Sequence, residues 1–208
     1  MKPEDKNIAS ALDRSLANLG LDYVDLYLIH HPYHSSTPEE HLAKWREMEA
    51  LKEAGLARSI GVSNYLVEHL EPIVAGAKHK PVINQVEYHP YLQRGDLLVW
   101  HREHGIAVEA YGPLTAITKV PDGPVDPVYE RLAKKYGVGP GVIALRWCLD
   151  LGIVAVTTSG NEQRLQSYQR ALPSFKLTPK EVEEISEAGR QKHYRGFWNH
   201  KIAADDKR

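Results

Sequence analysis

Short apolar runs alternate with amphipathic stretches along most of the chain. Residues 4–19 carry apolar side chains at helical spacing, which predicts a helix with one buried stripe that ends at Gly20. The run 23–29 that follows is rich in β-branched and aromatic residues and predicts a buried strand. The helical stripe consists of Ile8, Leu12, Leu16 and Leu19.

This pairing of strand and helix repeats toward the C-terminus. Short strands that alternate with helices predict parallel βαβ units, and hence an α/β fold of the (β/α)8 TIM-barrel type. The pattern contains about five strands where a closed barrel needs eight, so we expect an incomplete barrel with about the last five β/α units, the shortfall lying before residue 1. We expect one domain over residues 1–208. Further strands are predicted at 58–62, 82–86, 106–110 and 153–156, and helices at 37–55, 67–77, 96–104, 142–151, 162–170 and 179–187.

Composition narrows the classes of partner. The 208 residues are 42% hydrophobic and carry a formal net charge of −1, which gives no reason to expect nucleic acid or a membrane surface as partner. The first ten residues are too polar for a secretory signal, and no apolar run is long enough to span a bilayer. Cys148 is the single cysteine, which excludes an internal disulfide. We therefore expect a cytoplasmic protein.

Five sequence segments together resemble the aldo-keto reductase family and occur in the family's order. This resemblance covers nearly the whole chain and implies reduction of an aldehyde or ketone with NADPH. The Thr-Thr-Ser version of the last segment, and the tail FWNHKIAADDKR, resemble fungal ketoreductases of the family. The five segments are LDYVDLYLIHHP (21–32), GVSNY (61–65), NQVEYHPYLQ (84–93), AYGPL (110–114) and GIVAVTTSGNEQRL (152–165).

His30 follows the first predicted strand, where a side chain can face the mouth of a barrel. The resemblance implies that His30 is the catalytic histidine, which polarises the substrate carbonyl by donating a hydrogen bond. The alternative is a structural histidine at a strand end. The resemblance places His31 and the tail residue Trp198 at the substrate pocket, with an exposed tail aromatic as the alternative for Trp198. His30, His31 and His34 lack a carboxylate at suitable spacing, so we expect no metal site.

Three polar side chains at strand ends suit an amide ligand. Ser63, Asn64 and Gln85 offer hydroxyl and amide groups that both donate and accept, and the resemblance assigns them to the nicotinamide carboxamide. A Ser-Asn pair is also a common helix cap or turn. Tyr111, before the turn at Gly112, is expected to stack on the nicotinamide ring, with a core tyrosine as the alternative.

The phosphates of the cofactor are expected to lie against two loops. Leu114 would continue around the pyrophosphate, whereas Thr158, Ser159 and Arg164 would bind the adenosine phosphates at a helix N-terminus. Arg164 favours NADPH over NADH, although Thr158 stands where many relatives have lysine. An arginine in a first helical turn is also commonly solvated surface.

The leading interpretation is therefore an NADPH-dependent carbonyl reductase with a small-molecule substrate. In the family, a tyrosine from the earlier strands and loops is the general acid, and a lysine and an aspartate from the same region tune its pKa. We therefore expect activity to be impaired, and the open sheet edge to favour self-association. One alternative is a non-redox cyclase, dehydratase or small-molecule binder in secondary metabolism, with His30, His31 or Glu87 as acid or base. Another is an inactive interaction protein.

Overall fold

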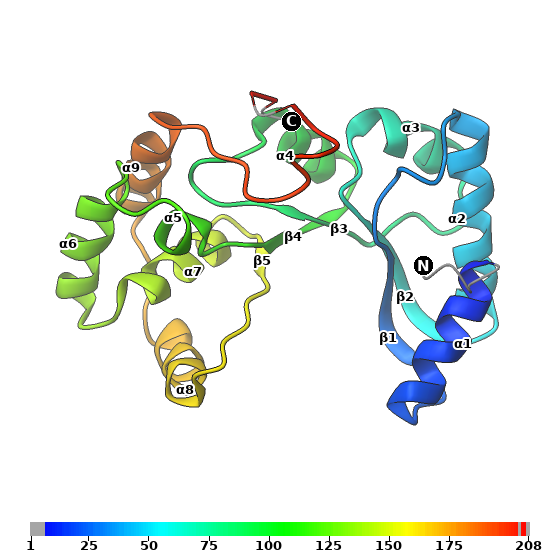
Figure 1. Ribbon diagram of the computed structural model, residues 1–208, viewed down its shortest axis with the longest axis horizontal. Coiled ribbons are helices and arrows are strands. Elements are labelled where there is room, and N and C mark those ends of the chain that lie inside the picture. The colour runs from blue at the N-terminus through cyan, green and yellow to red at the C-terminus, as the bar shows by residue number, and fades with distance from the viewer. Residues whose placement is uncertain (1–6, 204, 207–208) are drawn as a thin grey trace. The chain divides into compact units, whose positions relative to one another are not determined.

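The computed structural model describes residues 7–203, 205 and 206, and it alternates helices with strands along the chain (Figure 1). Its internal contacts divide it into two compact units. Unit 1 comprises residues 1–84 and 100–107, and unit 2 comprises residues 85–99 and 108–208. Each unit is described by itself, and the expectation of a single domain stays a prediction.

Unit 1 is built from two parallel strands and three complete helices. The strands pair in register from Val24 opposite Ala57 to Ile29 opposite Val62. The second helix begins at the predicted position, where the Thr37 hydroxyl and the Glu40 carboxylate form a capping box. The elements are α1 (Ile8–Leu19), β1 (Val24–Ile29), α2 (Pro38–Glu53), β2 (Ala57–Ser63) and α3 (Val67–Gly76).

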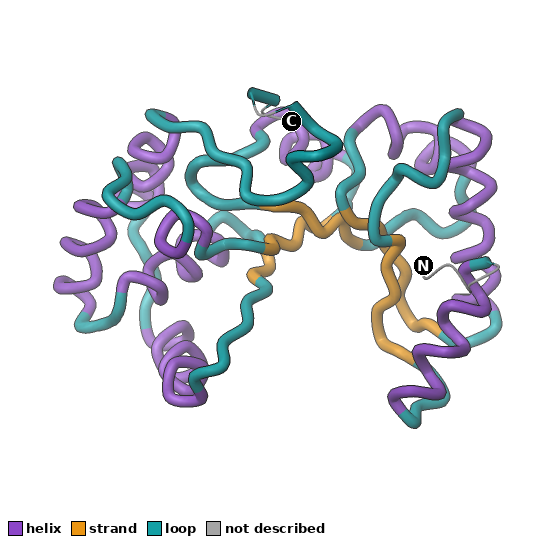
Figure 2. The backbone as a smooth tube through the Cα atoms, viewed as in Figure 1, coloured by secondary structure: helices purple, strands orange, loops and turns teal. Residues whose placement is uncertain are grey.

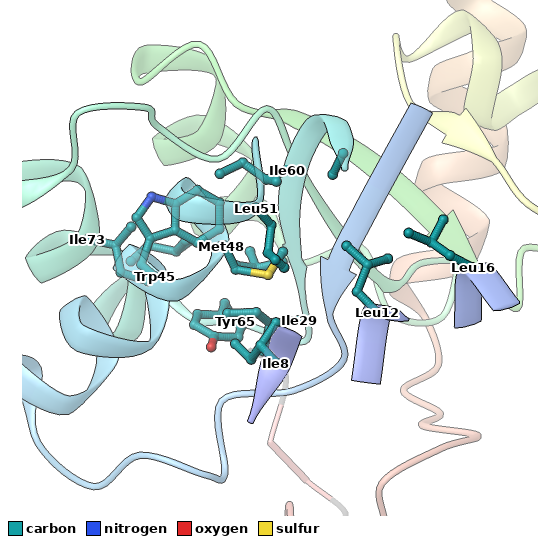
Figure 3. Close-up of a cluster of buried hydrophobic side chains, with 13 residues drawn as sticks. Ile8, Leu12, Leu16, Ile29, Trp45, Met48, Leu51, Ile60, Tyr65 and Ile73 are labelled. Carbon is teal, nitrogen blue, oxygen red and sulfur yellow. The ribbon is translucent and has the colours of Figure 1, made fainter. Parts of the chain in front are cut away.

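The core of unit 1 lies between these helices and the two strands (Figure 3). Trp45 and Met48 of α2 are fully buried, and the Trp45 indole N–H donates to the main-chain oxygen of His79 at 2.7 Å. Because each large side chain removes much apolar surface from water, this cluster supplies much of the unit's stability. Its other buried members include Ile8, Leu12, Leu16, Ile29, Leu51, Ile60, Tyr65, Leu70 and Ile73.

The first strand is less buried than its sequence predicts. Tyr23 and Leu26 are 38% and 37% exposed, and the strand's burial pattern is mostly exposed or intermediate. The sheet continues with β3 (Ile83–Glu87), β4 (Ala107–Tyr111) and β5 (Val154–Ala155). The strand order is β1-β2-β3-β4-β5, so among the strands of the described residues β1 stands at one end and has β2 as its one neighbour. Leu19, predicted on the buried stripe, is 61% exposed because α1 ends there at the left-handed Gly20.

Unit 2 is mainly helical, with long connecting loops (Figure 2). In this unit β4 and β5 pair in parallel, with Glu109 opposite Val154 and Ala110 opposite Ala155. The short helices α5 (Thr115–Thr118) and η1 (Leu172–Ser174) were not predicted, and β5 has two residues where four were expected. The helix α4 (Gly95–Glu103) is divided between the two units. The other helices of unit 2 are α6 (Asp126–Tyr136), α7 (Pro140–Asp150), α8 (Glu162–Ala171) and α9 (Pro179–Arg190).

Helix α7 is the most buried helix of unit 2. Trp147 is fully buried and stacks on Tyr88 with ring centroids 5.2 Å apart, and its N–H donates to Ser186 of α9. The neighbouring Cys148 thiol is also fully buried, and this burial raises its pKa to about 12. Among the described residues, no helix combines the length and the hydropathy that crossing a membrane requires.

Candidate functional site

The predicted site residues of unit 1 lie just beyond two paired strands. Because Ile29 of β1 stands opposite Val62 of β2, His30 and Ser63 follow at the same edge of the sheet. Asn64 has a left-handed backbone, with φ of 62°. Its amide nitrogen donates to the main-chain oxygen of His30 at 2.9 Å and to Oγ of Ser63 at 3.0 Å.

The Asn64 side chain therefore joins the ends of β1 and β2. Ser63 and Asn64 are buried, whereas the side chain of His30 is exposed. His30 thus combines a fixed main chain with a side chain that solvent or a ligand can reach. This is the arrangement expected of a residue that acts on a bound substrate.

His30 and His31 line a cavity of about 370 Å³ in unit 1. Its lining combines apolar residues such as Met48 with polar and basic groups. A pocket of this volume is of the size that binds small molecules. The other lining residues are Ile8, Ala11, Arg14, Ser15, Tyr27, Leu28, Ile29, His34, Ser35, Lys44 and Tyr65.

The histidines after β1 form a cluster of rings. The His31 ring lies 4.2 Å from that of His34 and 5.4 Å from that of Tyr33, measured between centroids. Burial, together with the charges of Lys44 and His30, lowers the pKa of His34, so that it is neutral near pH 7. Within the described ranges, 7–203 and 205–206, no group of three or more His, Cys, Asp or Glu side chains is arranged to hold a metal ion.

In unit 2, Gln85 lies on β3 with its side chain half-buried. Its amide nitrogen donates to the carboxylate of Glu109 on β4. This contact fixes the orientation of the Gln85 amide group, which is a requirement for recognising another amide. Sequence reasoning did not single out Glu109, because a strand carboxylate has no signal of its own.

Tyr111, at the end of β4, contacts the C-terminal tail of the chain through its side chain. The Phe197 ring meets the Tyr111 ring edge to face, with centroids 5.3 Å apart, and Trp198 makes a side-chain hydrogen bond to Tyr111. Burial and the nearby Glu87 charge raise the pKa of Tyr111 to about 12. Tyr111 is therefore a neutral phenol over the physiological range, held on one side by the tail.

The turn after Tyr111 is tightly packed. Gly112 has a φ of 63°, and a Cβ atom there would lie 3.0 Å from Phe197 and 3.0 Å from Oγ1 of Thr115. Leu114 packs against an apolar cluster centred on Leu145 and Tyr168. Leu114 therefore helps to fix this loop through its side chain.

The predicted phosphate-binding residues lie around the start of α8. Asn161 caps the helix, because its side-chain oxygen accepts from the Arg164 N–H at 3.1 Å. The Ser159 hydroxyl accepts from the Asn161 N–H at 3.1 Å, and the side chains of Thr158 and Arg164 are exposed. A capped helix start with two hydroxyls and a guanidinium can accept a phosphate group.

Glu87 is a residue whose role the sequence did not indicate. It is fully buried at the end of β3, and its carboxylate accepts from the main-chain N–H groups of Gly196 and Phe197. These contacts leave it poorly suited to the acid–base role considered from the sequence. Its position in the segment NQVEYHPYLQ was the only signal, and that signal did not reveal the tail as its partner.

The structure thus brings the predicted residues together in two sets. In unit 1, His30, Ser63 and Asn64 are in direct contact, and His31 shares a cavity with His30. In unit 2, Tyr111 and Trp198 are in contact. The roles assigned to all of these residues stay predictions. The other predicted residues of unit 2 are Gln85, Gly112, Leu114, Thr158, Ser159 and Arg164.

Comparison with known proteins identifies relatives along most of the chain. The model of the aldo/keto reductase family matches residues 2–190. The horse (Equus caballus) aldo-keto reductase family 1 member C23 is 40% identical over 211 residues, covering 90% of this chain and 65% of the horse protein. The NADPH-dependent alpha-keto amide reductase of Saccharomyces cerevisiae is 40% identical, over 92% of this chain and 64% of the yeast protein. The chain therefore spans slightly less than two thirds of the length of these relatives.

Solved structures show the same likeness. An aldo/keto reductase from Brucella melitensis aligns with a TM-score of 0.78 and 34% identity, covering 90% of this chain and 71% of that one. A Bombyx mori aldo-keto reductase in complex with NADP aligns with a TM-score of 0.77 and 37% identity, over 86% of this chain and 61% of that one. The predicted fold class, a barrel-type β/α fold present in part, is confirmed.

Proposed function

We propose that this chain, which belongs to the aldo/keto reductase family, binds NADPH and reduces an aldehyde or ketone to an alcohol. The observation that carries the proposal is the hydrogen bond of 2.9 Å from the Asn64 amide to the main-chain oxygen of His30. This hydrogen bond links Asn64, which is expected to bind the cofactor amide, to His30, which is expected to polarise the carbonyl. Two relatives support the choice of cofactor, since one is named NADPH-dependent and another was solved with NADP.

The donor groups of the chain fit this cofactor. In unit 1, the amide and hydroxyl groups of Asn64 and Ser63 match a carboxamide. In unit 2, the Gln85 amide has the same complementarity, and the neutral ring of Tyr111 offers an aromatic face. The capped start of α8, with exposed Arg164, fits a phosphate. When bound, NADPH supplies the hydride that adds to the carbonyl carbon.

His30 would act on the carbonyl oxygen. An N–H of its exposed ring would donate a hydrogen bond to that oxygen and stabilise the negative charge that develops as hydride adds. The product alcohol also requires a proton on this oxygen, and the family's tyrosine acid lies outside the five matched segments. We therefore expect slow turnover by this chain alone, since losing general acid catalysis costs roughly 10²–10⁴-fold in rate.

A titration with NADPH, followed by quenching of tryptophan fluorescence, tests the proposal. We expect saturable binding that Asn64→Ala weakens, whereas Asn18→Ala, at an exposed position on α1, leaves it unaltered. Oxidation of NADPH in the presence of aldehydes, measured at 340 nm, then tests turnover, and His30→Ala should lower it. Absence of saturable binding at millimolar NADPH would overturn the proposal.

We also propose that copies of the chain associate through exposed apolar strand positions. Leu26 of β1 is 37% exposed at the end strand, where backbone groups are available for pairing. Sedimentation velocity should show a mass that rises with concentration and that Leu26→Lys lowers. Leu19→Lys, at an exposed position on α1, is the matched control. A monomeric mass at all concentrations would contradict association.

A further inference from the structure

Within unit 2, the tail that follows α9 runs from that helix toward β3 and β4 (Figure 1). Glu87 of β3 holds the tail there. The carboxylate accepts from the Gly196 N–H at 2.6 Å and from the Phe197 N–H at 3.3 Å. Lys119 adds to this attachment, because its ammonium donates to the Gly196 oxygen at 3.2 Å and lies 4.0 Å from the Phe197 ring centroid. The tail backbone is thus fixed at two consecutive residues.

The same two tail positions lead directly to Tyr111. Phe197, whose N–H is bound by Glu87, places its ring at 87° to the Tyr111 ring. The next residue, Trp198, makes a side-chain hydrogen bond to Tyr111. Both the ring and the side-chain polar group of Tyr111 therefore depend on where the tail lies.

We propose that Glu87 is a positioning residue, which holds the tail and thereby fixes the ring of Tyr111 in the orientation that receives the cofactor. The inference rests on the proposed function in one respect, namely that Tyr111 stacks on the nicotinamide. Glu87 itself is fully buried, so it acts through the tail and not on the substrate.

The surroundings of Glu87 suit a carboxylate that binds main-chain N–H groups. His89 Nε2 lies 3.1 Å from Glu87 Oε1, and the Nε of Arg94 donates to the main-chain oxygen of Glu87 at 2.7 Å. Burial lowers the pKa of His89, which is therefore neutral and can donate from Nε2. Hydrogen bonds to an ionised acceptor are stronger than neutral ones, so a neutral amide at position 87 holds the tail less well.

Two variants separate this role from general support of the fold. Glu87→Gln keeps the side-chain volume but removes the charge, and Glu183→Gln is the matched control, because Glu183 pairs with Arg190 on the exposed face of α9. Arg195 is 4% exposed, so trypsin should cleave after it slowly while the tail is held. We expect Glu87→Gln to raise this cleavage rate by on the order of tenfold, as judged from the strength of hydrogen bonds to charged groups.

The orientation of Tyr111 is measured without cofactor, in a ¹³C-tyrosine-labelled chain in which Tyr111→Phe assigns the ring resonance. Glu87→Gln should shift or broaden that resonance, and Glu183→Gln should not. Gly196→Pro removes the stronger of the two N–H donors from the tail side, so it gives the same test if the Glu87 variant fails to fold. An unchanged resonance in a folded variant of either kind would overturn the inference.

Cofactor affinity completes the test. NADPH should bind several-fold more weakly to Glu87→Gln than to the parent chain, with the Glu183→Gln value unchanged. A released tail with unaltered NADPH affinity would refute the positioning role and leave the proposed function intact. If the parent chain binds no NADPH, the proposed function fails, while the proteolysis and the Tyr111 resonance still decide whether Glu87 orients this ring through the tail.

Discussion

The side-chain amide of Asn64 donates a hydrogen bond of 2.9 Å to the main-chain oxygen of His30. A residue in the left-handed region, beyond the end of β2, thereby fixes the backbone of the residue that follows β1. Asparagine suits this position because it tolerates positive φ better than most residues and carries a donor of the right length. Backbone conformation and side-chain chemistry are thus required of the same residue.

Two substitutions separate these requirements. Asn64→Gly loses the side-chain hydrogen bonds but still adopts the left-handed backbone without strain. Asn64→Ala loses the hydrogen bonds and is also strained in that conformation. We expect unit 1 to be destabilised by about 1–3 kcal/mol in Asn64→Gly, and by about 1 kcal/mol more in Asn64→Ala. Urea unfolding followed by circular dichroism measures the difference, and equal stability of the two variants would show that φ of 62° carries no cost here.

Gly61 lies where β2 approaches its neighbours most closely. A Cβ atom at this position would lie 2.6 Å from the main-chain oxygen of Ile83 and 2.7 Å from Leu28. Because a main-chain oxygen cannot move aside without disturbing the strand, Gly61→Ala should cost about 1–3 kcal/mol or more.

Gly76→Ala is the control for this change. There the nearest atom, also at 2.6 Å, is the end of the flexible Leu42 side chain, which can rotate away. Urea midpoints of the two variants should differ, with Gly61→Ala much the lower. Similar midpoints would mean that the strands around Gly61 separate easily.

Arg164 is expected to distinguish NADPH from NADH. Its main-chain N–H is fixed by Asn161, while its guanidinium is exposed beside the start of α8. Arg164→Gln should weaken NADPH binding by on the order of tenfold and leave NADH binding nearly unchanged, since only NADPH carries the extra phosphate. Arg170→Gln, at the other end of the same helix, should alter neither affinity in fluorescence titrations. Equal losses for both cofactors would contradict the assignment.

Glu181 makes the stability of unit 2 depend on acid pH. Burial opposes its ionisation, but hydrogen bonds from Lys135, Thr178 and Tyr136 outweigh this and lower its pKa from 4.5 to about 2. A carboxyl group whose pKa is lower in the folded state stabilises the fold above its unfolded value and loses that contribution as pH falls.

The contribution of Glu181 should therefore be complete above about pH 5 and disappear between pH 4.5 and pH 2. Discounted for solvent screening of the exposed Lys135, it amounts to about 1–2 kcal/mol. Glu181→Gln should be less stable than the parent at pH 6, and the difference should vanish near pH 2. A constant difference in urea midpoints over this range would argue that the charge of Glu181 is unimportant.

Local sequence signals predicted the order and type of the elements well, because each depends on neighbours in the chain. The Thr37–Glu40 capping box and the Trp45 helix are examples, since cap and periodicity are both local. The exposure of Leu26 was not predictable, because it depends on which strands flank β1. Strand composition reports the preferred backbone and not the number of neighbours.

For the candidate site too, local signals were predictable from the sequence and contacts between distant segments were not. His30, Asn64 and Tyr111 could be proposed as site residues because each lies at or just after the end of a strand within a recognisable motif. The role of Glu87 was not found, because its partners Gly196 and Phe197 lie 109 and 110 positions away and offer only main-chain N–H groups. Almost every residue type has a main-chain N–H, so a contact with such a group requires no particular residue. No sequence pattern could therefore indicate this contact.

Because Cys148 is buried, this single thiol can be used to measure how often unit 2 opens. With no exposed surface and a pKa raised to about 12, the sulfur reacts with a thiol reagent only when α7 separates from its surroundings. The rate of labelling then reports how often unit 2 opens. Unit 1 contains no cysteine and therefore contributes nothing to this signal. The single cysteine thus permits the opening rate of unit 2 to be measured separately from that of unit 1, without an introduced probe residue.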